Sequence, residues 1–170
     1  MIEFEKTYLA KFLPKGIEKC RKKEILDIYI PKSESHPTLR IRKNGDKYEM
    51  TKKRPVKGTD SSVQREDTIV LSKEEFDELA RLEGKRVRKI RHYYDYNGIN
   101  TEIDIFQDSL KGLVLVDVEF VCEEDKNCFQ MPEFCLADVT QEKLFAGGML
   151  CGKTYSDIEL FLNEMGYKKL

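Results

Sequence analysis

Apolar and charged residues alternate over several stretches of the chain, and a period of two is typical of β-strands with one buried face. The clearest cases are Ile2-Glu3-Phe4-Glu5 and the stretch Leu113–Val121, which carries Asp117 and Glu119. In each stretch two carboxylates share one strand face, while the apolar residues between them point to the other face. Neighbouring carboxylates repel each other, so this acidic face needs a cation or basic side chains opposite it.

The same patterns predict about eight strands, mostly joined as hairpins, with two or three helices, which is an α+β class on an antiparallel sheet. Asn44-Gly45 and Asn97-Gly98 are strong signals for two-residue hairpin turns. Ser72 with Glu75, and Ser156 with Glu159, predict capped helix starts. Weaker helices are expected over 16–23 and 140–146, a loop over 55–62 and an irregular connection over 123–132. The expected strands cover residues 2–12, 24–30, 38–43, 46–54, 62–71, 86–96, 99–106 and 110–122.

Length and composition favour one folded domain over residues 1–170. The 170 residues are 40% hydrophobic and 36% charged, and the net charge is −1. This balance argues against a general nucleic-acid or membrane-surface binder. No apolar run is long enough for a membrane span, and the N-terminus does not resemble a signal peptide. We therefore expect no membrane partner and no stable nucleic-acid partner, whereas a homodimer stays open.

The cysteines indicate a reducing compartment. They are odd in number and include no Cys-x-x-Cys motif: Cys20, Cys122, Cys128, Cys135 and Cys151. We interpret them as reduced thiols in a cytoplasmic protein. A zinc site from Cys122, Cys128 and Cys135 is disfavoured, because the spacing is irregular and no histidine lies nearby.

Charged residues of like sign recur at every second position in many of the expected strands, on the face opposite the apolar residues. Eight antiparallel strands can close into a barrel. With helices packed on the outside, the apolar face would be covered and the charges would line the lumen. The expected lumen set is Glu3, Glu5, Arg40, Arg42, Lys52, Arg54, Glu66, Lys89, Arg91, Glu102, Asp104, Asp117 and Glu119.

A lumen with both signs of charge suits a polyphosphate bound with a divalent metal. Arginine and lysine bind phosphate oxygens, and clustered carboxylates are the ligands that Mg²⁺ or Mn²⁺ prefers. For a single pair such as Arg40 and Arg42, a solvated strand face with cross-strand ion pairs is the better explanation, and for Glu3 and Glu5 alone the two explanations are equal. An RNA-binding face over residues 40–43, 52–54 and 85–91 is a second alternative. The repeated like charges favour the lumen, and the aligned carboxylates count against RNA.

The ordered set Glu3-x-Glu5, Arg40-x-Arg42, Lys52, Glu66, Lys89-x-Arg91, Glu102-x-Asp104 and Asp117-x-Glu119 resembles the CYTH superfamily, the triphosphate tunnel metalloenzymes. The resemblance implies an eight-stranded antiparallel tunnel that binds a triphosphate and a divalent metal. Asp138-Val-Thr140 resembles a later motif of the family. One residue departs from the family's Glu-x-Glu-x-Lys motif, because Thr7 stands at the lysine position. Lys6 is out of phase there, and Lys11 is in phase but further along.

Roles follow as expectations from this set. Phosphate binding is expected from Arg40, Arg42, Lys52, Arg54, Lys89, Arg91, Lys11 and Lys153. Metal binding is expected from Glu3, Glu5, Asp117 and Glu119, and catalytic roles from Glu5, Glu102, Asp104 and Glu119. The expected activity is metal-dependent hydrolysis of inorganic tripolyphosphate or a similar small triphosphate. A class IV adenylate cyclase, a thiamine triphosphatase and a non-catalytic polyphosphate or nucleotide binder remain alternatives.

Overall fold

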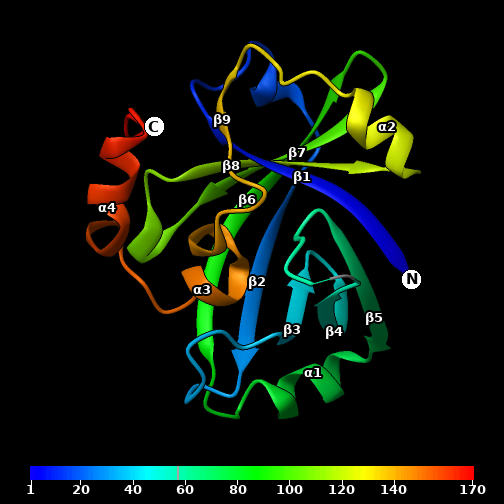
Figure 1. The fold of residues 1–170 in the computed structure, drawn as a ribbon. Coiled ribbons are helices and arrows are strands. Elements are labelled where there is room, and N and C mark those ends of the chain that lie inside the picture. Colours follow the sequence, from blue (N-terminus) through cyan, green and yellow to red (C-terminus); the bar gives the residue numbers. More distant parts are fainter. Residues whose placement is uncertain (57) are drawn as a thin grey trace.

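The strands form one antiparallel sheet that closes on itself as a barrel (Figure 1). The computed structural model describes residues 1–56 and 58–170, so residue 57 of the expected 55–62 loop lies outside the described part. The strands are β1 (Ile2–Ala10), β2 (Lys22–Ile30), β3 (Leu39–Asn44), β4 (Lys47–Pro55), β5 (Val63–Leu71), β6 (Lys85–Tyr96), β7 (Ile99–Phe106), β8 (Val114–Phe120) and β9 (Cys135–Asp138). Their order is β5-β4-β3-β2-β6-β7-β8-β1-β9, and β5 also pairs with β1. The eight-stranded antiparallel barrel is therefore confirmed, with β9 as an additional strand.

Both predicted hairpins are present, and their registers decide which side chains share a face. Tyr96 pairs with Ile99 across the Asn97-Gly98 turn. The first hairpin is shifted by one residue from the expected turn, because Asn44 pairs with Lys47 and the turn is Gly45-Asp46. Gly45 has φ 59°, a left-handed conformation that glycine adopts without a Cβ penalty. Both turns leave two residues between the paired strand ends, as tight hairpins require.

Short helical segments connect and cover the strands. They are η1 (Ile17–Lys19), α1 (Lys73–Leu79), η2 (Asp108–Leu110), α2 (Glu123–Cys128), η3 (Lys143–Phe145), α3 (Gly147–Leu150) and α4 (Tyr155–Glu164). The predicted capping box of α1 is confirmed, since the Ser72 amide donates to Glu75 at 2.7 Å and the Glu75 amide donates to Ser72 at 3.1 Å. None of the helices satisfies the length and apolarity that crossing a membrane requires, for the described residues.

Several predicted boundaries are wrong. The residue that caps the start of α4 is Thr154 rather than Ser156, since the Thr154 amide donates to the Asp157 carboxylate at 2.7 Å. The expected irregular connection over 123–132 contains α2, and the helix expected over 140–146 is only the 3₁₀ turn η3. The helix expected over 16–23 is limited to η1, since β2 already begins at Lys22. The expected strand 110–122 begins only at Val114, because η2 precedes it.

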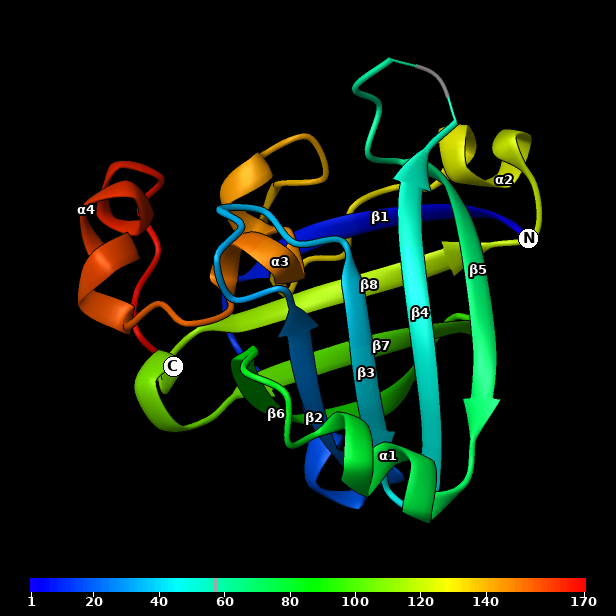
Figure 2. The ribbon, with the colours of Figure 1, turned by 90° about the horizontal axis from the view of Figure 1, so that it is seen from below.

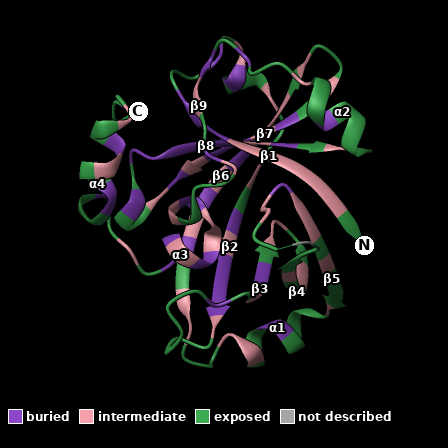
Figure 3. Ribbon diagram, in the orientation of Figure 1, coloured by how far each residue is buried: buried purple, intermediate pink, exposed green. Residues whose placement is uncertain are grey.

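Figure 3 shows buried residues along β2 and in α3 and α4. The buried apolar residues form clusters on the outside of the barrel and at one of its ends. On the outside, Phe76 of α1 packs with Ile28 and Ile41. A second outer cluster joins η1 and the segment around Phe134 to β1, β7 and β8. The helices α3 and α4 do not follow the prediction that helices cover the outside. Their residues Leu150, Ile158 and Leu162 pack with residues of the barrel end, and Figure 2 shows α3 between α4 and the end of β2.

Candidate active site

The cross-strand registers bring most of the predicted charged residues to the lumen face. Residues directly opposite each other in an antiparallel pair share a face. Glu5 lies opposite Glu119, Glu102 opposite Asp117, and Arg91 opposite Asp104. The remaining pairs extend the same face to β3, β5 and the rest of β1. The predicted residues on it are Glu3, Glu5, Arg40, Arg42, Glu66, Lys89, Arg91, Glu102, Asp104, Asp117 and Glu119.

The middle of the lumen holds a buried ion-pair network centred on Asp104, which is fully buried. Arg91 Nε and Nη2 donate to the two Asp104 oxygens at 2.7 Å each, and Lys89 Nζ also donates to Asp104. Arg91 additionally contacts Glu102, and it lies 3.5 Å from Asp117. Burial alone would raise the pKa of Asp104, but Arg91 and Lys89 outweigh it and hold that pKa at about 2. Asp104 therefore stays charged and orients both cations.

Asp27 is a second buried acid that the sequence analysis missed. Arg42 Nε and Nη2 donate to its two oxygens at 2.6 and 2.8 Å, in a bidentate pair. Burial would raise the pKa of Asp27, but the charge of Arg42 outweighs it and lowers that pKa. Asp27 lies in the apolar strand EILDIYI, in phase with Ile25 and Tyr29. The sequence signal that could have identified Asp27 is an acidic residue in the middle of an otherwise apolar strand.

On β4 the lumen cation is Lys53, and the predicted orientation of Lys52 and Arg54 is wrong. Lys53 Nζ lies 2.6 Å from Glu3 and 3.3 Å from both Glu5 and Glu66. Burial would lower the pKa of Lys53, but Glu5 and Glu3 outweigh it and raise that pKa. Lys52 and Arg54 are exposed on the outer face, where Arg54 pairs with Asp67 at 3.0 Å. The cause is the hairpin register, which places Thr51 rather than Lys52 opposite Arg40.

The carboxylates of β1, β7 and β8 are only partly neutralised. Partial burial, followed by the charges of Glu102 and Glu3, raises the pKa of Glu119 to about 7 although the side chain reaches solvent. Burial also raises the pKa of Asp117, despite the opposing charges of Lys89 and Arg91, and that of Glu102, despite Arg91. These raised pKa values come mainly from burial, with a smaller contribution from neighbouring carboxylates, and a bound cation would favour the ionised forms.

This donor set fits a divalent metal by its chemistry. Paired carboxylates on facing strands supply the oxygen ligands that Mg²⁺ and Mn²⁺ prefer. In the described part of the chain, no three acidic, histidine or cysteine side chains converge tightly enough to form a finished metal site. In this conformation the carboxylates of β1 contact Lys53, and those of β7 contact Arg91.

The lumen is accessible at its acidic end and apolar at the other. Arg42, Lys89 and Arg91 are each 7–8% exposed, whereas Glu119 is exposed. Beyond these cations the lumen face carries Leu9, Tyr29, Val87, Phe106 and Leu115, all in one apolar cluster with α3 and α4. The α3 backbone approaches this end so closely that a Cβ at Gly147 would overlap the Tyr29 hydroxyl. The lumen face thus runs from the exposed Glu119 through buried cations to an apolar end packed against α3 and α4. We refer to this arrangement as a one-ended lumen, and to its acidic end as the mouth.

Two predicted phosphate ligands lie away from the charged lumen. Lys11 is exposed and follows the end of β1 at Ala10, and Leu9 already belongs to the apolar end. The expectation that Lys11 enters the lumen is therefore wrong. Lys153 follows α3, where its carbonyl accepts a hydrogen bond from Ser109 at 2.9 Å. Among the described residues its side chain has no recorded ion pair with a lumen carboxylate, and its role stays a prediction.

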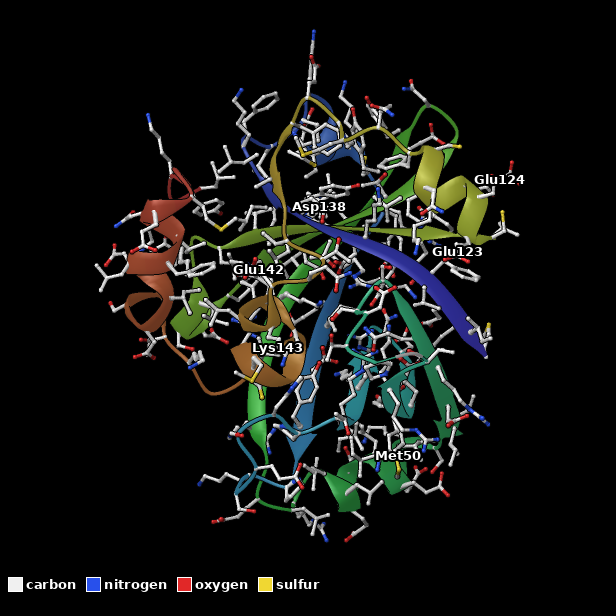
Figure 4. All side chains as sticks on the ribbon, in the orientation of Figure 1. Met50, Glu123, Glu124, Asp138, Glu142 and Lys143 are labelled. Atoms are coloured by element: carbon white, nitrogen blue, oxygen red, sulfur yellow. The ribbon has the colours of Figure 1, made fainter. Side chains whose placement is uncertain are left out.

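Thr7, at the departing position of the predicted motif, faces Asp117 in the lumen. Its hydroxyl donates to Asp117 Oδ1 at 2.8 Å. Its amide donates to the Thr140 hydroxyl at 3.0 Å, and its carbonyl accepts from the Val139 amide at 2.8 Å. The segment Asp138-Val-Thr140, labelled at Asp138 in Figure 4, therefore attaches to β1 beside the acidic residues.

Known proteins are similar to this chain in sequence and in fold. The CYTH domain family matches residues 3–145. An inorganic triphosphatase of Nitrosomonas europaea is 29% identical over 147 residues, which cover 85% of this chain and 93% of that protein. The crystal structure of the inorganic triphosphatase NE1496 has a TM-score of 0.63 and 27% identity, covering 88% of this chain and 93% of its own. The PH1012 protein of Pyrococcus horikoshii shares the fold, with a TM-score of 0.53 and 16% identity over 98% of this chain and 92% of its own. With most of its length matched by the family, this chain belongs to the CYTH family.

Proposed function

We propose that this protein hydrolyses inorganic tripolyphosphate, or a similar small triphosphate, with Mg²⁺ or Mn²⁺ as cofactor. The observation that carries the proposal is the one-ended lumen, in which buried cations lie beyond an acidic mouth. A polyphosphate needs cations along its length, and its metal needs carboxylates at the other side. The similarity to an inorganic triphosphatase supports tripolyphosphate as the first substrate to test.

The substrate enters with its terminal phosphate first. The apolar cluster around Tyr29 and Phe106 blocks the far end of the lumen, so only the acidic mouth admits a charged ligand. Arg42, Lys89 and Arg91 then bind the terminal phosphate, with Asp27 and Asp104 fixing their orientation. We assign Asp104 a positioning role in place of the catalytic role expected from the sequence, because both of its oxygens already accept from Arg91 and Lys89. The remaining phosphates are bound by Arg40, which lies opposite Tyr29 and 4.0 Å from Glu66, and by Lys53, which lies 2.6 Å from Glu3.

The metal would be held by Glu3, Glu5, Asp117 and Glu119. It neutralises charge on the phosphate oxygens when bound. Burial raises the pKa of Glu119 to about 7, so a bound cation would favour the ionised form of this residue. A metal held there would offset the negative charge of the bound substrate inside the barrel.

The reaction is attack of water on the terminal phosphorus. A new P–O bond forms with the water oxygen, and the bridging P–O bond breaks with its electron pair leaving on the diphosphate. Glu102, whose pKa burial raises, orients the water and accepts its proton. The products are orthophosphate and diphosphate, and no covalent enzyme intermediate is required. The buried cations stabilise the charge that develops on the phosphoryl oxygens.

The site is tested by Glu5→Gln and Arg42→Ala, assayed for phosphate release from tripolyphosphate with Mg²⁺, Mn²⁺ or chelator. Each variant should lose at least ~100-fold in kcat/KM, the scale for removing one charge-stabilising group. Circular dichroism and thermal unfolding provide the control for folding. Full activity in both variants would exclude the lumen as the active site. Cyclic AMP formed from ATP would indicate a cyclase, faster turnover of thiamine triphosphate a thiamine triphosphatase, and tight binding without turnover a binding protein.

We propose a cytoplasmic location with a small triphosphate as the partner. The five cysteines are all free, which supports a reducing compartment. Fractionation of cells that express a tagged chain would test the location directly.

A further inference from the structure

Lys126, on α2, is a buried cation outside the lumen. Its side chain is 6% exposed, and its ammonium donates to the Ser62 hydroxyl at 2.8 Å. The other contacts recorded for the ammonium are weak, with Glu123 at 3.9 Å and the Phe4 ring centroid at 6.0 Å. Figure 2 shows α2 beside the connection between β4 and β5, and Figure 4 labels Glu123 and Glu124 on the helix. Burying an ammonium group is unfavourable unless hydrogen bonds or opposite charges compensate for the water that it loses.

The residue that Lys126 contacts belongs to a hydrogen-bonded segment, Asp60–Ser62. The Ser62 hydroxyl and amide both donate to Asp60, at 2.7 and 2.9 Å. Gln141 holds the same segment from the other side, because its amide group donates to Asp60 at 2.9 Å and accepts from the Ser61 amide at 3.2 Å. The segment is therefore fixed between Lys126 and Gln141, which come from different parts of the chain.

Segment 60–62 completes the barrel beside the acidic residues of β1. Only Ile2–Phe4 of β1 pair with β5, and β9 pairs with β1 only from Tyr8 onward. Between these ladders the Glu5 amide donates to the Ser62 carbonyl at 3.1 Å. Gln64 then joins the Glu5 side chain to the segment, donating to Glu5 Oε1 at 3.2 Å and to the Ser61 carbonyl at 3.0 Å.

We propose that Lys126 is a positioning residue for Glu5, acting through segment 60–62. The metal-binding part of this inference rests on the proposed function. The structural part of the inference is independent of the proposed function, because it concerns only the hydrogen bond from the Glu5 amide to the Ser62 carbonyl. Lys126 does not touch substrate or metal, so its loss loosens Glu5 without removing any ligand.

Two measurements on the metal-free protein test the inference. The variant Lys126→Met keeps the approximate length and the apolar stem of the side chain while removing the ammonium, so the fold should be retained. Amide exchange of Glu5 by NMR should become about tenfold faster, the scale for losing a hydrogen bond to a charged group. The dissociation constant for Mn²⁺, measured by electron paramagnetic resonance, should rise about tenfold for the same reason. Lys73→Met is the control, since Lys73 lies on α1 and its one ion pair among the described residues is with Asp77, at 2.9 Å.

Gln141→Met supplies an independent test of the same segment. It should reproduce both effects, and the double variant should show less than the sum of the two, because both residues act on one segment. Unchanged Glu5 exchange in Lys126→Met, or strictly additive effects, would overturn the inference. If the parent protein shows no metal-dependent turnover, the proposed function fails while the exchange measurement still decides the role of Lys126.

Discussion

Replacing Lys53 with methionine tests the lumen assignment most directly, because Lys53 is the only β4 side chain that contacts three carboxylates in the described structure. Its ammonium lies between Glu3, Glu5 and Glu66, at 2.6 to 3.3 Å, and these side chains are 15–23% exposed. Removing one partner of such a cluster should cost about 3 kcal/mol, the lower end of the range for breaking buried ion pairs. For a chain of this size that lowers Tm by about 6–12 °C. Losing a phosphate-binding cation should also reduce kcat/KM about 100-fold or more.

The stability loss should depend on pH. Lys53 lowers the pKa values of Glu3 and Glu66, so its removal raises both. A carboxyl whose pKa in the folded state exceeds its unfolded value is penalised as pH rises through the folded value. Lys53→Met should therefore be closer to the parent in Tm at about pH 5 than at about pH 8. Mn²⁺ should restore part of the loss at the higher pH, because it replaces the missing positive charge.

Lys52→Met is the matched control. Lys52 is exposed on the outer face and lies opposite Asp67 of β5. Its loss should change the free energy of unfolding by no more than about 0.5 kcal/mol and leave hydrolysis within about twofold of the parent. Thermal unfolding across pH and tripolyphosphate hydrolysis measure both variants. The reasoning is refuted if Lys52→Met loses activity while Lys53→Met keeps it, or if the Lys53→Met deficit is the same at both pH values.

Three further predictions follow from the same geometry. Asp27→Asn leaves Arg42 without its buried charged partner, so Tm should fall by about 10 °C. Tripolyphosphate should then raise the Tm of the variant by more than it raises the Tm of the parent. An equal rise in Tm for both proteins would contradict this. Because the pKa of Glu119 is raised from 4.5 to about 7, the metal-free protein should lose stability as the pH rises from about 4.5 to about 7, and Glu119→Gln should flatten that profile. A triphosphate esterified at both ends should be hydrolysed at least about 100-fold more slowly than tripolyphosphate, because the Tyr29 end excludes the second ester; comparable rates would refute the one-ended lumen.

The sequence predicts the barrel and most of its lumen because alternation in a strand assigns each side chain to a face. It also contained the information that corrects Lys52. A two-residue hairpin turn always pairs an even-numbered residue with an odd-numbered one, so Arg40 and Arg42 cannot share a face with Lys52 and Arg54. The second hairpin obeys the same rule, with Arg91 opposite Asp104. Lys53 was therefore predictable from the turn, although not from the charge pattern of its own strand.

The closed end of the lumen was not predictable from local pattern. Leu9, Phe106 and Leu115 have lumen-face parity but are apolar, and nothing within each strand distinguishes them from the charged residues nearer the mouth. Their environment comes from α3 and α4, which are separated in the chain from β8 by α2, β9 and η3. The α3 segment is too short to give a periodic signal. Its placement depends on tertiary contacts such as that of Gly147 with Tyr29.

The threonine at position 7 changes how the acidic residues are balanced. A lysine there would have placed a positive charge opposite Asp117, whereas Thr7 supplies a neutral hydroxyl at 2.8 Å. Burial consequently raises the pKa of Asp117, and the nearby charges of Lys89 and Arg91 only partly oppose it. Arg91 is already bound to Asp104 and Glu102, and Lys53 contacts the carboxylates of β1 and β5 instead. The negative charge of β8 is therefore left for a bound metal to neutralise, so we expect this site to depend more strongly on its metal than one that carries the lysine.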